Sequence, residues 1–177
     1  GALREVYAKF ALSLDSPEKA RFDFDRSFRA QLAGRSAGKI TIDGGSISVS
    51  APLIKTAGTS CALAVDNCEL RNNFNTGNTY IYGGAVYIFD GTCSFRDTVI
   101  TGCRASEGGA VYCSSECTIY SGTTISGNLA TDYGGAFYVN STLNLYGGVI
   151  TGNSYTSSSG NGGGIYVPAS GTCAIHG

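Results

Sequence analysis

Gly83-Gly84-Ala85-Val86-Tyr87 decides the fold of this chain, because the same pattern returns three more times. It recurs as Gly-Gly-Ala-Val-Tyr at 108–112, Gly-Gly-Ala-Phe-Tyr at 134–138 and Gly-Gly-Gly-Ile-Tyr at 162–166, with spacings of 25, 26 and 28 residues. A sequence that repeats itself at a nearly fixed interval indicates structural units that stack on one another.

A second element keeps the same period. It reads Ile-Thr/Ser-Gly followed by Cys or Asn, at 100–103, 125–128 and 150–153, with a looser copy at 70–73. The last residues of these segments are Asn73, Cys103, Asn128 and Asn153. An inward asparagine column can satisfy the backbone groups of a turn by hydrogen bonding along the stack. We therefore expect these four residues to form a structural turn ladder and not a ligand site.

The period and composition together select one repeat architecture. A period near 25 with glycine-bounded, β-branched segments suits a coil of three short strands, whereas the leucine framework of leucine-rich repeats is missing. Glycine and threonine are too frequent for helical repeats. The sequence thus predicts an all-β solenoid, a right-handed parallel β-helix of about five coils, each roughly 4.8 Å above the last.

Alternation within each motif assigns its side chains to two faces. Val86 and Ile88 are expected to point inward and Tyr87 outward, with apolar equivalents at 111/113, 137/139 and 165/167. The outward residues Tyr87, Tyr112, Tyr138 and Tyr166 then form an aromatic ladder. Such a stripe is able to bind glycans or a protein partner, although cross-strand stacking alone also explains it.

Four of the seven cysteines recur at the start of the strand after the tyrosine segment: Cys61, Cys93, Cys117 and Cys173. Leu143 takes this place in one coil, so the position is expected to be inward and apolar. One interpretation is a ladder of buried thiols that act as small hydrophobic groups. The other is disulfides between neighbouring coils, because stacked Cα atoms lie within disulfide range. With one histidine and no CxxC pair, no metal site is expected, and no cofactor.

Composition limits the setting in which the chain works. Only 14% of residues are charged and the net charge is −1, which gives no reason to expect nucleic acid as a partner. No apolar run is long enough to span a membrane, and no signal peptide is visible. Seven cysteines favour an oxidising compartment, so we expect an extracellular or cell-surface location. Asn140-Ser141-Thr142 is a candidate glycosylation site.

The first 38 residues differ from the rest and are expected to be a capping segment, followed by the β-helix at 39–177. Residues 1–40 hold 8 of the 12 basic and 5 of the 13 acidic residues, a balance of +3, against −4 for the remainder. Alternation at 6–14 predicts a strand, although 3–14 also fits one face of a helix. Ser16-Pro17 predicts the start of a helix that runs past Phe24, Phe28 and Leu32 towards Gly34. Strand alternation resumes at 40–42 and 47–49.

The two repeated elements are similar to the repeats of the polymorphic membrane proteins, outer-membrane adhesins of bacteria that alternate GGA-apolar with FxxN. GGAV, GGAV, GGAF and GGGI resemble the first element, and ISGN and ITGN the second, with Ile in place of Phe. The cysteine content is closer to secreted protist or algal relatives. The resemblance covers about residues 39–177 and implies a surface-exposed adhesive or structural role without catalytic residues. Cys103 in place of one Asn departs from the pattern.

The leading hypothesis for function is a non-catalytic extracellular module, adhesive or part of an assembly. Because 173–175 opens a further coil, we expect that the parent protein continues or that another subunit covers this end. The alternative is a polysaccharide lyase or glycoside hydrolase of the pectate-lyase type, which needs clustered carboxylates. The acidic residues scatter over different repeat positions, and Glu107 and Asp132 come nearest to a pair. Ice binding is a remote option, because no Thr-x-Thr face repeats through the coils.

Overall fold

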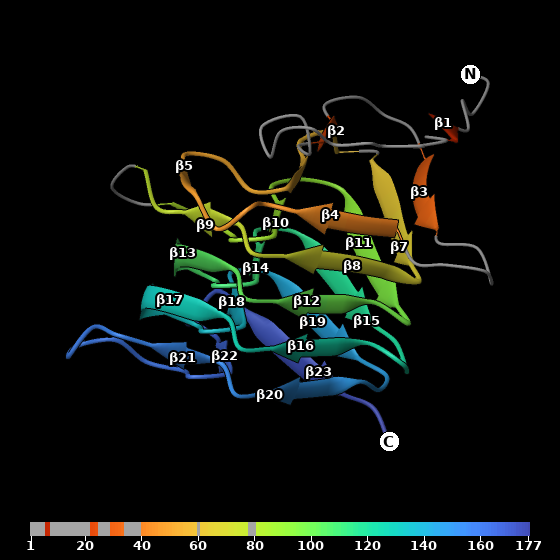
Figure 1. The fold of residues 1–177 in the computed structure, drawn as a ribbon. Helices are drawn as coiled ribbons and strands as arrows, with labels where there is room; N and C mark the ends of the chain where they lie inside the picture. The colour runs from red at the N-terminus through yellow and green to blue at the C-terminus, as the bar shows by residue number, and fades with distance from the viewer. Residues whose placement is uncertain (1–5, 8–21, 25–28, 34–39, 60, 78–80) are drawn as a thin grey trace.

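The computed structural model describes residues 6–7, 22–24, 29–33, 40–59, 61–77 and 81–177. Its secondary structure in these ranges consists of 23 strands in four parallel sheets. The chain passes through the sheets in a fixed order and then returns to the first, so that strands of successive circuits lie side by side (Figure 1). The fold is therefore a parallel β-solenoid of about five coils, as the repeat predicts. The described ranges contain no helix, and hence none that could cross a membrane.

A full coil contains four strands, one more than the period suggests. Sheet 1 contains β2 (Phe22–Phe24), β6 (Ile54–Thr56), β10 (Val86–Ile88), β14 (Val111–Cys113), β18 (Phe137–Val139) and β22 (Ile165–Tyr166). Sheet 2 contains β1 (Val6–Tyr7), β3 (Arg29–Ala33), β7 (Ala62–Asp66), β11 (Thr92–Arg96), β15 (Glu116–Ile119), β19 (Thr142–Leu145) and β23 (Thr172–Ile175). Sheet 3 contains β4 (Ile40–Asp43), β8 (Cys68–Arg71), β12 (Val99–Thr101), β16 (Thr124–Ser126) and β20 (Val149–Thr151). Sheet 4 contains β5 (Ser48–Val49), β9 (Phe74–Asn75), β13 (Arg104–Glu107), β17 (Leu129–Tyr133) and β21 (Ser154–Tyr155).

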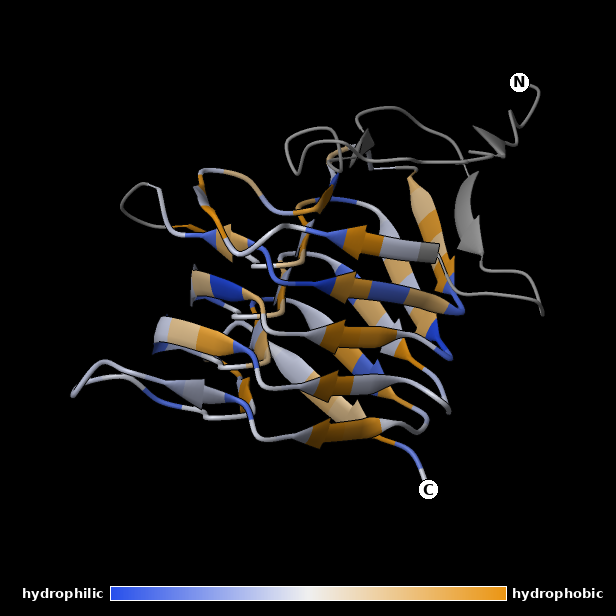
Figure 2. Ribbon diagram, in the orientation of Figure 1, coloured by the Kyte–Doolittle hydropathy of each residue, from blue (hydrophilic) through white to orange (hydrophobic). Residues whose placement is uncertain are grey.

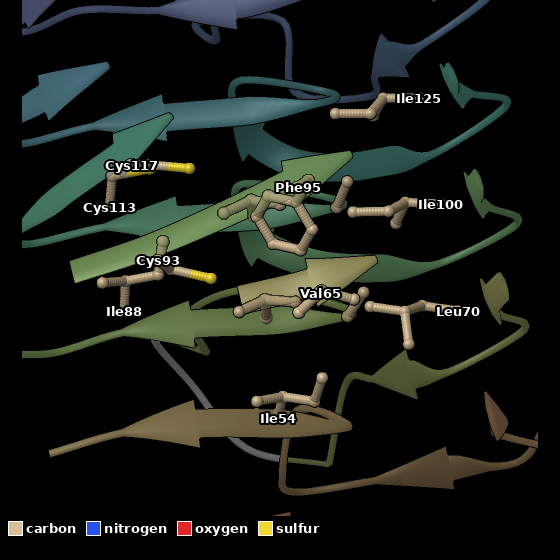
Figure 3. Close-up of a cluster of buried hydrophobic side chains, with 14 of the residues drawn as sticks. Ile54, Val65, Leu70, Ile88, Cys93, Phe95, Ile100, Cys113, Cys117 and Ile125 are labelled. Atoms are coloured by element: carbon tan, nitrogen blue, oxygen red, sulfur yellow. The ribbon is translucent and has the colours of Figure 1, made fainter. Parts of the chain in front are cut away.

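The interior is a continuous apolar column. Because side chains alternate along each strand, every second residue points inward and meets the inward residues of the other sheets. Figure 3 shows the ring of Phe95 on β11 facing Ile100 on β12, both fully buried. Hydrophobic residues occupy the same place on successive strands of sheet 3 (Figure 2), where Leu70, Ile100 and Ile125 are paired in register. Like residues therefore stack on like residues from coil to coil.

The glycine pairs form the corner that leads from sheet 4 into sheet 1. The first glycine has a positive φ, for example 64° at Gly108, which residues with a Cβ adopt only with strain. The second has no room for a side chain wherever a further coil follows: a Cβ on Gly109 would lie 2.7 Å from the Leu129 carbonyl oxygen and against that of Gly135, whereas at Gly163 on the last coil the nearest atom is 3.4 Å away. Each role requires glycine for a different reason, which explains why both positions of the motif repeat.

The N-terminal segment differs from the expected strand–helix–strand order. Residues 22–24 and 29–33, which were expected to lie in a helix, are strands β2 and β3, so the helix is wrong there. The open edges of β6 and β7 provide partners for them, and pairing with these edges outweighs the helical spacing of the apolar residues. The rest of the predicted helix, most of the predicted strand at 6–14 and the boundary at residue 38 lie outside the described residues. The strands β1, β2 and β3, which precede residue 38, belong to the same sheets as strands that follow it.

Candidate functional site

The outward tyrosines of sheet 1 form one column. Tyr87 pairs with Tyr112, Tyr112 with Tyr138, and Tyr138 with Tyr166 on successive coils. The rings of Tyr112 and Tyr138 are stacked, with centroids 4.7 Å apart and planes 11° from parallel. Tyr87 meets Tyr112 edge to face at 5.4 Å, and Tyr138 lies 5.2 Å from Tyr166. We call these four residues the first column.

A second column lies across the Gly-Gly corner and consists of the residues that precede each glycine pair: Tyr82, Glu107, Tyr133 and Asn161. Backbone pairing aligns Tyr82 with Glu107, Glu107 with Tyr133, and Tyr133 with Asn161. An irregularity between Ala105 and Glu107 shifts the register, so Glu107 lies opposite Tyr133 and not opposite Asp132. The two columns together form a surface that we call the tyrosine face.

The columns interlock, since a second-column ring contacts the first-column residue of the next coil. Tyr82 lies 4.4 Å from Tyr112, and Tyr133 lies 4.7 Å from Tyr166, measured between ring centroids. Tyr112 is consequently enclosed between Tyr82 and Tyr138 and is only 7% exposed. The stacked pairs Tyr112–Tyr138 and Tyr133–Tyr166 cover one face of each ring, whereas the other rings meet at a tilt or edge to face. Tyr112 supports the surface, whereas Tyr87, Tyr138 and Tyr166 are partly exposed on it.

Glu107 is the one charged residue within the two columns. Partial burial raises the pKa of its carboxyl group, and the negative charge of Asp132 raises it further. Burial also raises the pKa of Tyr112 and Tyr138, and in both cases the charge of Glu107 is the next contribution. The charge of Glu107 therefore acts on both of these tyrosines. The sequence shows Glu107 and Asp132 as the nearest to a carboxylate pair but does not indicate the partial burial of Glu107.

A second aromatic stack, which sequence reasoning missed, lies on the corner after sheet 2. The Arg96 guanidinium lies 4.3 Å from the Tyr120 ring centroid, Tyr120 stacks on Tyr146 at 5.8 Å, and Tyr146 stacks on His176 at 4.0 Å. Each residue stands three positions after an inward residue of sheet 2 (Cys93, Cys117, Leu143 and Cys173), so the register could have revealed the column. We call it the corner stack.

The cysteines lie inside the solenoid. Cys93 pairs with Cys117, Cys117 with Leu143, and Leu143 with Cys173, but Cys93 pairs on its other side with Leu63, so the expected equivalence of Cys61 is wrong. Cys61 precedes Leu63 by two residues, and a shift of two keeps the same face, so Cys61 is still buried.

Burial makes the thiols unreactive. All seven cysteines are free and no two lie at disulfide distance, so the structure shows thiols and not the alternative of disulfides between coils. Burial raises the pKa of Cys93 and Cys117 far above the usual value, and that of Cys103 to about 12. Only the thiolate is nucleophilic, so these groups fill space. Among the described residues, no group of three or more His, Cys, Asp or Glu could hold a metal ion.

The turn ladder is a hydrogen-bonded column. Asn128 accepts a bond from the Cys103 backbone N–H at 2.9 Å and donates to the Ile100 carbonyl at 3.0 Å. Asn153 repeats this one coil on, where it accepts from the Asn128 backbone N–H at 3.0 Å. Asn73 occupies the equivalent place, because the Arg104 N–H donates to its carbonyl, but its side-chain amide donates instead to the carbonyls of Ala51 and Gly84. These residues hold the turns together.

Two further features bear on the expected partners. Asn140 of the glycosylation motif is exposed at the corner after β18, where its side-chain oxygen accepts a hydrogen bond from Ser170 at 2.6 Å. On the last coil, Val149 is 54% and Ile175 79% exposed.

No protein-family model, curated protein or solved structure matches the chain in the comparisons with known proteins.

Proposed function

We propose that the chain is a non-catalytic extracellular or cell-surface module that binds a partner through the tyrosine face. The observation that carries this proposal is the continuity of that face over four coils, with a partly exposed tyrosine on each except the one that bears Tyr112. Tyrosine combines a large contact area with a hydroxyl group and loses little conformational entropy on binding, which suits it to interfaces. The resemblance to adhesin repeats supports the same role.

The chain's chemistry also favours a binding role. The buried thiols are protonated and unavailable as nucleophiles. Most carboxylates lie at different repeat positions, so no row of acids accompanies the tyrosines. The apolar side chains exposed on the last coil provide a second surface, on which a further coil or another subunit can dock. This arrangement is typical of a unit within a larger assembly.

Substitutions that keep the fold can test the tyrosine face. In Tyr138→Phe/Tyr166→Phe, the rings remain stacked while two outward hydroxyl groups are removed. We expect the variant to lose most of its binding to immobilised cell-surface proteins and to glycan arrays. The matched control is Tyr120→Phe/Tyr146→Phe, which makes the same change in the corner stack and should bind like the wild type. Equal binding by all three proteins would exclude the tyrosine face as the binding surface.

A polysaccharide-cleaving enzyme is the second candidate, and one observation favours it. The raised pKa of Glu107, next to the charge of Asp132, is the pattern expected of a general acid paired with a second carboxylate. Release of reducing ends or unsaturated products from a polysaccharide panel, abolished in Glu107→Gln, would favour the enzyme over the binding module.

A further inference from the structure

The position of Glu107 in the tyrosine face is the starting point. In the second column it takes the place that Tyr82 holds one coil before and Tyr133 one coil after. The rings of Tyr82 and Tyr133 each contact the first-column tyrosine of the next coil. The same register places Glu107 beside Tyr112 and Tyr138, in agreement with the effect of its charge on both. Backbone pairing therefore sets Glu107 between two tyrosines of its own column, and its charge acts on two tyrosines of the first column.

This carboxylate has no cationic partner among the described residues. The ion pairs found there join Arg71 to Asp43 and Glu69. Arg104, on the same strand as Glu107, instead places its guanidinium 4.2 Å from the ring centroid of Phe74. Glu107 is thus half-buried, without a counter-ion in the part of the chain that the structure describes, and subject to the like charge of Asp132, an arrangement that penalises the charged form. Charged groups held at such a cost concentrate at functional sites.

Aromatic rings of this chain already accept cations from its own side chains. Lys55 pairs with Tyr87 one coil before it, and its ammonium group lies 5.8 Å from the Tyr87 ring centroid. The guanidinium groups of Arg96 and Arg104 approach their rings more closely, at 4.3 and 4.2 Å. A planar guanidinium stacks on aromatic groups and pairs with carboxylates through two parallel hydrogen bonds, which an ammonium cannot do.

We infer that Glu107 and the tyrosines around it form a binding site for an arginine side chain of a protein partner. This inference rests on the proposed function and names the chemistry that the tyrosine face selects. The carboxylate of Glu107 accepts hydrogen bonds from the guanidinium, whose stem lies along the partly exposed rings of Tyr82, Tyr133 and Tyr138. The incoming charge supplies the counter-ion that the described residues do not provide at this position.

A titration followed by backbone amide NMR tests the inference on the intact chain. The probe is N-acetyl-arginine amide, and N-acetyl-citrulline amide is the uncharged control of nearly the same shape. We expect saturable shifts centred on the amides of Gly108, Tyr112 and Tyr138 with the arginine probe and none with citrulline. In Glu107→Gln the affinity should fall at least tenfold, whereas Glu116→Gln, which changes an exposed carboxylate on sheet 2, should bind like the wild type.

The outcomes separate this inference from the proposed function. Absence of saturable shifts, equal shifts with citrulline, or full binding by a folded Glu107→Gln variant would overturn the arginine site. Tighter binding of glucosamine than of the arginine probe would overturn the assignment to a protein partner in favour of an amino-sugar polymer. If the arginine probe fails while Tyr138→Phe/Tyr166→Phe still loses its binding to partners, only the inference falls and the tyrosine face stands.

Discussion

The turn ladder inside the solenoid and the tyrosine face outside it share the same coil-to-coil register. They differ in the hydrogen-bond and charge partners of their polar groups. In the ladder, Asn128 and Asn153 bond to the backbone of neighbouring turns through both ends of their amides. On the face, Glu107 lies half-buried without a counter-ion among the described residues, although the same repeat could have placed a tyrosine there, as it does at Tyr82 and Tyr133. Stability governs the first ladder. At the tyrosine face, burial and the charge of Asp132 disfavour the charged form of Glu107, and this contrast supports the binding role proposed above.

The largest expected effect concerns the coil-to-coil register that the turn ladder and the tyrosine face share. In Gly109→Ala the new Cβ would meet the carbonyl groups of Leu129 and Gly135, which belong to the backbone of the next coil and cannot move aside singly. We expect a loss of about 3 kcal/mol or more in the free energy of unfolding, measured by urea denaturation, because overfilled backbone contacts relax poorly.

Gly127→Ala is the matched control for this substitution. Its φ is 63°, but the nearest atom to the added Cβ would be Thr101 Oγ1 at 3.7 Å. Only the backbone strain of about 1–2 kcal/mol should appear. Equal losses in the two variants would mean that conformation and not close approach between coils decides the glycine positions.

Much of this register could be predicted from the sequence, and the failures have physical causes. Gly-Gly-Ala-Val-Tyr combines two glycine constraints with alternation, so the pairing of Tyr87, Tyr112 and Tyr138 follows from it residue by residue. Cys61 was aligned two residues away from its true position because a shift of two preserves the inward face and leaves the pattern unchanged. Burial patterns alone cannot detect such an error.

The secondary structure of the N-terminal segment and the tyrosine face were harder to predict. Residues 22–24 and 29–33 fit a helical spacing and also an alternating one, and only the open edges of β6 and β7 select the strands. The environment of Glu107 depends on contacts across a glycine corner and on a register shift after Ala105. The sequence places Glu107 before the glycine pair but gives no sign that the rings of two other coils lie beside it.

An intermediate effect is expected within the turn ladder. Asn128→Ala removes the acceptor of the Cys103 N–H and the donor to the Ile100 carbonyl in a residue that is 1% exposed. Each buried group left without a partner should cost about 1–3 kcal/mol, measured by urea denaturation. Asn153→Ala serves as the control, because this residue is only partly buried and solvent can replace some of its bonds. If Asn128→Ala were no more harmful than Asn153→Ala, the ladder would not be the stabilising feature described above.

The smallest effect is expected at Glu107 and has the opposite sign. Because burial, and then Asp132, raise the pKa of Glu107, the folded state binds the proton more tightly than the unfolded state does. Stability should therefore fall as the pH rises from the ordinary glutamate pKa through the raised folded value, and it should stay lowered at neutral pH. Glu107→Gln removes this penalty, so the variant should be more stable than the wild type at neutral pH and less sensitive to pH in the acid range.

Thermal unfolding from about pH 4 to about pH 8 measures this difference, with Glu116→Gln as the exposed carboxylate control. A Glu107→Gln variant that is less stable at neutral pH would show that the carboxylate is held by stabilising contacts. The contrast between the turn ladder and the tyrosine face would then disappear. A variant that gains stability while losing affinity for the arginine probe would show that the chain keeps a destabilising charge at this position because binding requires it.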